Sequence, residues 1–459
     1  MTSSIKLKAQ THWSLNPSLI INTPARMKKT VAFSLVFLSP LVAAQDLTDG
    51  QVDVVSARLA ESALQSWEIG THLQTILELN ATTYSVLNTK VSLPPPSTVP
   101  SNEQSALAPF FQLTKQVVSN RTTANNNTAG AQPFLPDGSA ADPASIGVGV
   151  LIANLTGQDA GQVNYAGAAT DQLDYLLNVV PRTSDGAISH RVSEVQLWSD
   201  FVYMVPPFLA YYGVTTKNRT LVAESYNQIK LYRQYLRDNT TGMWRHVLMG
   251  TSGNDPGFWS TGNGWAAAGM LRVITTIRQS EFANTFTNEQ TDLANWVQEI
   301  HTATYPHLDA TNVFTNYADQ PSTATGNFYD AASTALLAGT VYRAAILLKQ
   351  HASVPHAEKS RKTLFSTNGT APDNNSGSFT GYAHFDSNGW LMPVVNPHSY
   401  GVQGTQSPEG QAFVVQLHAA HRDWAAAGSP GENGALSSVH VGPTALLLGV
   451  LTSLAVIAL

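Results

Sequence analysis

Asp200 stands in the segment 197–204, LWSDFVYM, where a polar turn leads into a run of aromatic residues. A carboxyl group packed against aromatic walls has its charged form disfavoured by desolvation, and such an acid keeps its proton and can donate it. We therefore expect Asp200 to be a protonated acid. The residue type leaves a second interpretation open, a helix cap whose carboxylate accepts hydrogen bonds from the first backbone N–H groups.

Two further segments contain the groups that a sugar site needs. His246 follows the turn TGMWR and could donate to a sugar hydroxyl or orient a water, although a lone histidine in such a place is more often structural or merely exposed. In segment 258–265, FWSTGNGW, two glycines let the backbone approach a ligand, an asparagine can donate and accept, and indoles can stack on a pyranose ring. The alternative for this segment is a glycine-rich helix entry with core tryptophans.

A hydrolase with two carboxylates would take the second from the other ionisable residues near expected helix ends. These are Asp142, Asp171, Asp174, Asp185, His190, Glu194 and Asp330. The chain has no P-loop, dinucleotide fingerprint, HExxH, GxSxG or calcium loop in an interpretable context. We therefore expect neither a metal nor a cofactor.

The hydrophobic pattern indicates helices nearly throughout. Apolar residues recur every three to four positions from Asp49 to Gly70. Helical patterns follow at Glu103–Val118, Ile146–Leu155, Gly161–Val180, Asp200–Tyr212, Thr220–Arg237, Gly262–Arg278, Glu289–Tyr305, Asp330–Gln350 and Pro408–Ala427. Arg182–Val195 could hold a small hairpin, and Phe379–Tyr400 has strand or loop character. Helices without alternating βα units predict an all-α toroid of helical hairpins. An α-solenoid is the alternative, but no repeat of roughly 34 to 47 residues is visible.

Composition narrows the class of protein. The chain has 459 residues, 43% hydrophobic and 12% charged, enough for a large core. A net charge of -6 provides no basic field for nucleic acid. Because cysteine is absent, there is no disulfide framework, thiol nucleophile or cysteine-ligated zinc site.

The two ends predict export and a lipid anchor. Met27 and two lysines precede the apolar run TVAFSLVFLSPLVAA, which has the order of a secretory signal and suggests translation from Met27. Small residues at 433–435, a polar spacer and the tail ALLLGVLTSLAVIAL match a GPI-attachment signal. The tail could instead be a membrane anchor, but its 15 residues are fewer than the roughly 20 that a spanning helix needs. The predicted organisation is an extension and signal at 1–44, one catalytic domain at 45–427, and a stalk with the GPI signal at 428–459.

Candidate N-glycosylation sites agree with export, because such acceptors lie on the surface of secreted proteins. They are Asn80, Asn120, Asn126, Asn154, Asn218, Asn239, Asn368 and Asn374. We expect a glycoprotein at the cell surface that touches the membrane through its lipid alone. The sequence gives no indication of oligomeric state.

Five segments in order resemble the unsaturated glucuronyl and rhamnogalacturonyl hydrolases, glycoside hydrolase families 88 and 105 of the six-hairpin glycosidase superfamily. They are DGAISHR, WSDFVYMVPPFLAYYG, TGMWRHV, WSTGNGW and SPEGQAF. The likeness extends over roughly residues 142–427 and implies an (α/α)6 barrel, in agreement with the helical pattern.

The resemblance also implies a reaction and roles for residues. Such enzymes hydrate the C4=C5 double bond of a non-reducing unsaturated uronyl residue instead of attacking the anomeric carbon. Asp200 would be the general acid/base that protonates C4 and deprotonates the water adding at C5, after which the hemiketal opens and expels the remaining sugar. Asp142 matches the family's second active-site acid. The implied substrate-binding residues are His190, Met204, His246, Trp259, Asn263 and Trp265.

One departure from the family pattern concerns the substrate. Ser260 and Thr261 stand where the family has Gly-Arg. Loss of a charge-assisted contact from that arginine would cost about 1.5–3 kcal/mol. Either Arg191 or Arg245 compensates, or the ligand differs. The first hypothesis is therefore a secreted, GPI-anchored glycosidase for pectin-derived unsaturated oligosaccharides. The alternatives are a mannanase- or transglycosidase-like cell-wall enzyme of the same fold and a glycan-binding barrel without turnover.

Overall fold

The computed structural model describes residues 46–368 and 376–432, and both expected terminal signals lie outside these ranges. The α-helices of the described residues are α1 (Asp49–Ser62), α2 (Ser66–Leu79), α3 (Gln104–Ala124), α4 (Gly147–Leu155), α5 (Tyr165–Asp174), α6 (Phe201–Thr215), α7 (Arg219–Leu236), α8 (Ser260–Arg278), α9 (Thr287–Thr304), α10 (Ala331–Leu348), α11 (Val354–Leu364) and α12 (Pro408–Ala426). Three short helical turns, η1 (Asp142–Ile146), η2 (Tyr175–Val179) and η3 (Tyr305–His307), adjoin α4, α5 and α9.

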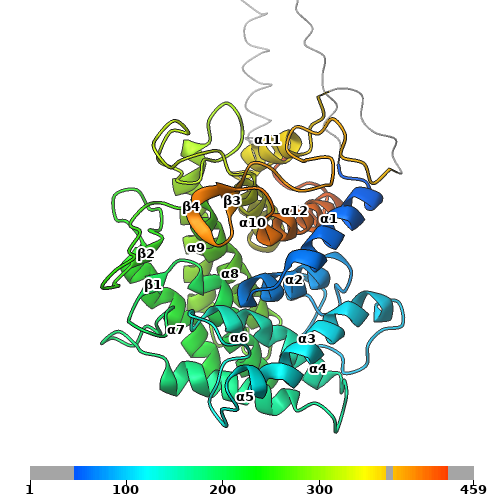
Figure 1. The fold of residues 1–459 in the computed structure, drawn as a ribbon, viewed down its shortest axis with the longest axis vertical. Helices are drawn as coiled ribbons and strands as arrows, with labels where there is room; N and C mark the ends of the chain where they lie inside the picture. Colours follow the sequence, from blue (N-terminus) through cyan, green and yellow to red (C-terminus); the bar gives the residue numbers. More distant parts are fainter. Residues whose placement is uncertain (1–45, 369–375, 433–459) are drawn as a thin grey trace, which may run out of the picture. The chain divides into compact units, whose positions relative to one another are not determined.

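The even-numbered helices form a closed inner ring. α2 contacts η1 and α4, which contact α6, and the ring continues through α8 and α10 to α12, which packs against α2 again. Each odd-numbered helix packs on the outside of an even-numbered neighbour, and the first helix α1, blue, lies beside the last helix α12, red-orange (Figure 1). This is the all-α (α/α)6 barrel that the sequence predicts.

Two short antiparallel strand pairs lie between the helices. β1 (Leu197–Trp198) pairs with β2 (Val247–Leu248), and β3 (Val394–Asn396) pairs with β4 (Ser399–Gly404). The β3–β4 hairpin was anticipated in part, because the strand character was assigned to Phe379–Tyr400. The β1–β2 pair was not anticipated, since two-residue strands leave no periodic pattern.

The inner helices are buried on almost every side, which explains their composition. α6, α8 and α10 are rich in apolar and small residues, and most of their side chains are inaccessible to solvent. α10 is the one helix in the described ranges that is long and apolar enough to cross a membrane, with mean hydropathy 1.5, and 83% of it is buried inside the barrel. In the outer helices α7 and α9, buried apolar positions follow a single stripe.

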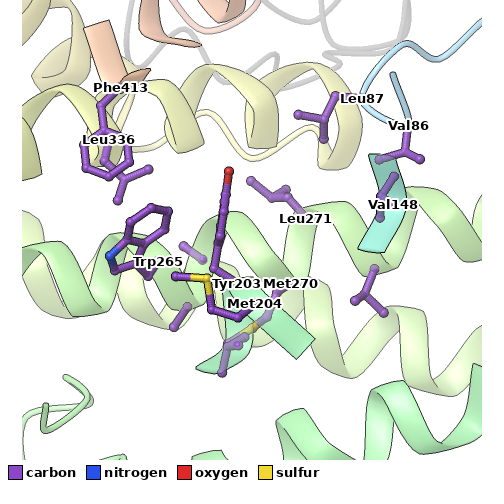
Figure 2. Packing of buried hydrophobic residues seen from close by; sticks show 14 of the residues in the cluster. Val86, Leu87, Val148, Tyr203, Met204, Trp265, Met270, Leu271, Leu336 and Phe413 are labelled. Carbon is purple, nitrogen blue, oxygen red and sulfur yellow. The ribbon is translucent and has the colours of Figure 1, made fainter. Parts of the chain in front are cut away.

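The aromatic floor of the barrel lies where the inner helices meet. Trp265 of α8 packs edge-on against Phe413 of α12, with ring centres 4.8 Å apart, and tilts against Tyr203 of α6 at 4.3 Å. Figure 2 shows Trp265 beside Leu336 and Phe413, with Tyr203, Met204 and Leu271 to their right. Because these rings come from different inner helices, they fix the spacing of the helix ends that carry the site.

Glycine sets the distance between α6 and α8. A Cβ at Gly269 would lie 2.0 Å from the backbone oxygen of Val202. Gly339 in α10 makes a matched control, because a Cβ there would meet the Leu417 Cα at an ordinary 3.6 Å. We expect Gly269→Ala to destabilise the fold by roughly 1–3 kcal/mol or more through overpacking. We expect Gly339→Ala to be neutral or stabilising by about 0.5–1 kcal/mol. Thermal unfolding of both variants checks this, and equal melting temperatures would contradict the close packing.

The helix boundaries differ from the sequence prediction at three places. The single helix expected over Asp49–Gly70 is two helices, because the chain leaves helical geometry at Ala63 before α2 begins at Ser66. α11 was missed, since its stretch is short and rich in charge. The helix expected over Glu103–Val118 continues to Ala124 as α3.

Candidate active site

A cavity of about 370 Å³ opens at the end of the barrel where the inner helices begin. Asp142 starts η1, Asp200 and Trp259 occupy the positions just before α6 and α8, and Glu409 lies in the first turn of α12. The positive ends of the helix dipoles therefore face this cavity. The aromatic residues on its walls are Trp67, Trp198, Trp259, Trp265 and Tyr400.

The structure brings together nearly all of the predicted site residues. Those that line the cavity are Asp142, His190, Asp200, Met204, His246, Trp259 and Trp265. Asn263 does not line it. Its side chain is fully buried, where Oδ1 accepts from the Trp244 N–H at 2.9 Å and Nδ2 donates to the carbonyl groups of Trp244 and Trp259. Asn263 therefore holds Trp259 in place rather than contacting a ligand, which corrects the expected substrate contact.

The pairing of β1 with β2 places Asp200 beside His246. Trp198 pairs with Val247, and the Ser199 N–H donates to the His246 carbonyl at 2.9 Å. His246 Nε2 then lies 3.5 Å from Asp200 Oδ2, longer than a normal hydrogen bond but within ion-pair distance. Catalytic hydrogen bonds are often long in ligand-free structures. The Asp200 side chain makes no capping bond to α6, so the helix-cap interpretation does not hold.

A second acid, Asp255, contacts the other ring nitrogen of His246. Asp255 Oδ2 lies 2.8 Å from His246 Nδ1 and accepts from the Tyr317 hydroxyl at 2.7 Å. The imidazole is fully buried and packs against Trp259 and Tyr400, with ring centres 4.3 and 4.4 Å away. Burial alone would lower the pKa of His246, but Asp200 and Asp255 together raise it above its usual value. The two carboxylates therefore favour the charged form of the buried imidazole.

The protonation state expected for Asp200 is wrong. Burial alone would raise the pKa of Asp200, but the hydrogen-bonding and charge interactions with His246 lower it below its usual value. The aromatic walls that the sequence suggested are present, yet the cation beside the carboxyl outweighs them. Asp200 is therefore a carboxylate in the resting site.

Asp255 gives the first pH prediction. In Asp255→Asn the buried imidazole loses one of the two charges that raise its pKa, so it becomes neutral at lower pH. Asp200 then lacks its cation and its own pKa rises. We expect the acidic limb of the pH–rate profile to move to higher pH, as measured by kcat/KM. An Asp255→Asn variant with an unshifted acidic limb would contradict the coupling.

The pKa of Asp142 is shifted in the opposite direction to that of Asp200. Burial raises its pKa well above the usual range, and the negative charges of Asp137 and Asp200 raise it further. His190 Nε2 lies 3.5 Å from Asp142 Oδ1, and burial lowers the pKa of that histidine to about 3. Because His190 is neutral, it cannot ionise Asp142 as His246 ionises Asp200. The pKa values of the two acids on this cavity are therefore shifted in opposite directions.

Glu409 is a further buried acid that the sequence did not single out. It belongs to the segment SPEGQAF, and its side chain faces the cavity near Trp67. Burial raises its pKa well above the usual range, and the charge of Glu68 adds to this. A protonated glutamic acid can donate a hydrogen bond to a sugar hydroxyl, which a carboxylate cannot.

The comparisons with known proteins agree with this architecture. The family model described as "Glycosyl Hydrolase Family 88" matches residues 108–384. The chain belongs to glycosyl hydrolase family 88. It is 25% identical over 136 residues to the unsaturated rhamnogalacturonyl hydrolase YesR of Bacillus subtilis (strain 168), covering 28% of this chain and 38% of YesR. The match thus spans little more than a third of that curated relative.

Solved structures share the fold of this family 88 chain. A family 105 glycoside hydrolase of C. acetobutylicum ATCC 824 superimposes with a TM-score of 0.58 at 14% identity, covering 81% of this chain and 99% of that chain. The unsaturated glucuronyl hydrolase of Bacillus sp. GL1, which is responsible for the degradation of glycosaminoglycan, gives a TM-score of 0.51 at 11% identity. That match covers 80% of this chain and 94% of the other.

The departure at Ser260 and Thr261 has a structural explanation in this family 88 barrel. Both residues are fully buried, and the Thr261 hydroxyl donates to Asp330 at 3.2 Å. Asp330, one of the candidates for a second carboxylate, instead caps α10 through the backbone N–H groups of Ala332 and Ser333. Position 261 therefore faces the protein interior in this chain, and no side chain from it reaches the cavity.

The other candidate carboxylates lie away from the cavity. Asp171 is paired with Arg121 at 2.8 Å, and Glu194 accepts from Thr251. Asp174 and Asp185 are exposed on the surface. Among the described residues, no group of three His, Asp or Glu side chains is arranged to hold a metal ion.

The residues that the sequence missed come mostly from loops. Asp255 and Tyr317 lie on loops and Tyr400 lies in strand β4, and their place at the site depends on chain pairing such as the Val247–Asp255 bridge. Glu409 could have been found, since it stands in the first turn of a predicted helix within a family-like segment.

Proposed function

We propose that this protein is a glycoside hydrolase that hydrates the C4=C5 double bond of an unsaturated uronyl residue at the non-reducing end of an oligosaccharide. One observation carries the proposal: Asp142 and Asp200 face the same indole-lined cavity, where burial raises the pKa of Asp142 and His246 lowers the pKa of Asp200. Hydration of a double bond requires a proton donor and a base for water at once, and pairs of groups with pKa values pushed apart supply both. Membership of family 88 supports the same reaction class.

The reaction follows from these protonation states. Asp142 gives its proton to C4, and the ring oxygen stabilises the cation that develops at C5. Asp200 takes a proton from the water whose oxygen bonds to C5, and His246 orients the Asp200 carboxylate. The resulting hemiketal opens by breaking the C5–O5 bond, the C1–oxygen bond to the remaining sugar breaks, and that sugar leaves with a proton. The family resemblance gave both proton transfers to Asp200; the protonation states favour dividing them between two acids.

The cavity walls suit a sugar ring. Trp198 stacks on His190 at 4.9 Å with nearly parallel planes, and Tyr400 stands edge-on to Trp198 at 6.0 Å. Partly exposed indoles bind the apolar faces of pyranose rings, and the polar groups between them fix orientation. The β3–β4 hairpin contributes Asn396, His398 and Tyr400 to the rim.

One screen separates this function from its alternatives. The protein is incubated with lyase-generated unsaturated disaccharides, and the ultraviolet absorbance of the conjugated double bond is followed. Loss of absorbance supports the proposal. Release of sugar from saturated mannan or galactan without that loss favours the mannanase-like enzyme, and binding without turnover of either favours a glycan-binding barrel.

We further propose that the substrates derive from pectin. YesR is named as an unsaturated rhamnogalacturonyl hydrolase, whereas the Bacillus sp. GL1 enzyme degrades glycosaminoglycan. Unsaturated galacturonyl-rhamnose and an unsaturated glycosaminoglycan disaccharide, compared at equal concentration, distinguish the two sources. A higher kcat/KM for the glycosaminoglycan disaccharide would contradict the pectin assignment.

We also propose that the protein is secreted, glycosylated and held at the cell surface by a GPI lipid. All candidate acceptors within the described residues have exposed side chains: Asn80, Asn120, Asn126, Asn154, Asn218, Asn239 and Asn368. Asn374 and both terminal signals lie outside the described ranges. Expressed in a eukaryotic cell, the protein should lose mass on treatment with peptide N-glycosidase and leave the membrane on treatment with a phosphatidylinositol-specific phospholipase. Retention on the membrane after phospholipase would favour a membrane-spanning tail.

A further inference from the structure

Carboxyl groups outnumber permanent positive charges on the lining of the cavity. The carboxyl groups on its lining are those of Asp137, Asp142, Asp200 and Glu409. Among the described residues that line the cavity, Arg191 is the sole arginine or lysine. A substrate that carries a carboxylate therefore meets one permanent positive charge in this site.

The Arg191 guanidinium lies beside Trp198 in the wall of the cavity, and its N–H donors have no partner among the described residues. No described carboxylate lies within ion-pair distance of it, and it makes no hydrogen bond to a described residue. It lies 5.8 Å from the centre of the Trp198 ring. The backbone of Arg191 is fixed by the bridge to Ser139 and by the bond from its N–H to Ser189 Oγ at 3.1 Å. Five unused N–H donors thus stand beside an indole face.

Gly138 leaves room for this guanidinium. A Cβ at position 138 would lie 3.3 Å from Arg191 Nη2, so a side chain there would press on the group. Trp198, on the other side, is fixed by the bond from its Nε1 to Gln196 Oε1 at 2.7 Å. The guanidinium therefore occupies a defined place between Gly138 and the Trp198 ring.

The other arginine near these loops is already engaged. Arg245 pairs with Asp238 at 2.6 Å, donates to the Pro256 carbonyl at 2.9 Å, and lies over the Phe258 ring at 5.1 Å. It does not line the cavity. Arg245 is therefore unavailable to a ligand in this cavity, and it serves as a matched control.

We infer that Arg191 binds the carboxylate at C5 of the unsaturated uronyl ring while that ring lies against Trp198. Arginine is suited to this, because its planar fork donates two parallel hydrogen bonds to a carboxylate. The contact orients the sugar so that C4 and C5 face the two reacting acids. This inference rests on the proposed function, since it names the group by which that substrate is selected.

The test compares an unsaturated disaccharide with its methyl ester, which keeps the double bond but has no negative charge. Wild-type protein should prefer the acid. Arg191→Gln should raise KM for the acid roughly ten- to a hundred-fold, the range of one charge-assisted contact, and leave KM for the ester nearly unchanged. Arg245→Gln should leave both substrates as in wild type. Equal loss on acid and ester in Arg191→Gln would overturn the inference while the proposed function stands.

A binding measurement distinguishes a failure of this inference from a failure of the proposed function. In the Asp200→Asn background, calorimetry gives the affinities for the acid and the ester without turnover. The inference predicts that adding Arg191→Gln removes the preference for the acid. If wild type turns over neither compound, the proposed function fails, and this comparison still decides the inference. A preference for the acid that survives Arg191→Gln would contradict it.

Discussion

Replacing Asp200 by asparagine is expected to lower kcat on unsaturated disaccharides by roughly 10²- to 10⁴-fold, the usual contribution of one positioned acid or base. Asparagine keeps the size of the side chain and cannot accept a proton from water. The ion pair with His246 is also lost, which removes a charge that raises the pKa of the imidazole. KM should change far less than kcat, since the walls of the cavity remain.

The control for this variant is Asp185→Asn. Asp185 is also an acid that the sequence offered as a candidate, but it is exposed and away from the cavity. Its replacement should leave kcat and KM unchanged. An Asp200→Asn protein that folds and retains more than about a tenth of the wild-type kcat would not fit a general base worth 10² or more.

Replacing Asp142 by asparagine is expected to lower kcat by roughly 10²-fold or more, because the group that protonates C4 is lost. The pH–rate profile carries a second signature. In wild type, activity requires the protonated acid and declines as the pH rises through the raised pKa of Asp142. Asp142→Asn should remove this alkaline limb from the residual activity. An unchanged limb would show that another group donates the proton.

Asp142→Asn should also raise the melting temperature at neutral pH. The pKa of Asp142 is raised above its ordinary value of 3.8 in the folded protein. The folded state therefore binds this proton more tightly than the unfolded chain does, so its contribution to stability is full below 3.8 and is lost as pH rises through the folded pKa. Asparagine cannot ionise and avoids that loss. A variant that is less active and more stable would fit a strained catalytic acid, whereas a drop in both would indicate a structural role.

The barrel of helices could be predicted because the sequence pattern that indicates it is local. Helical periodicity and the absence of βα alternation depend on residues close in sequence, and they predicted the barrel correctly. The segment FWSTGNGW, which opens α8, was also correctly predicted to bring tryptophans to the site. The role of its asparagine was not predicted correctly. Asn263 forms hydrogen bonds with the backbone of Trp244, which lies in the loop after α7, and the local sequence does not indicate that contact.

The protonation states could not be predicted from sequence, because they depend on distances between loops. Asp200 and Asp142 both lie in apolar surroundings at the start of a helical turn. They differ in the histidine beside each: His246 is backed by Asp255 and charged, while His190 has no such acid and is neutral. Asp255 lies in the loop that follows β2, and nothing in its local sequence marks it as a partner of His246.

The most direct test of the central claim follows two signals in one reaction. Absorbance of the C4=C5 double bond and release of the reducing-end sugar are measured over the same time course with an unsaturated disaccharide. If Asp142 and Asp200 hydrate the double bond, the absorbance falls at least as fast as the sugar appears, and both signals are lost together in Asp200→Asn. Release of the sugar while the absorbance persists would mean attack at the anomeric carbon and would contradict the account.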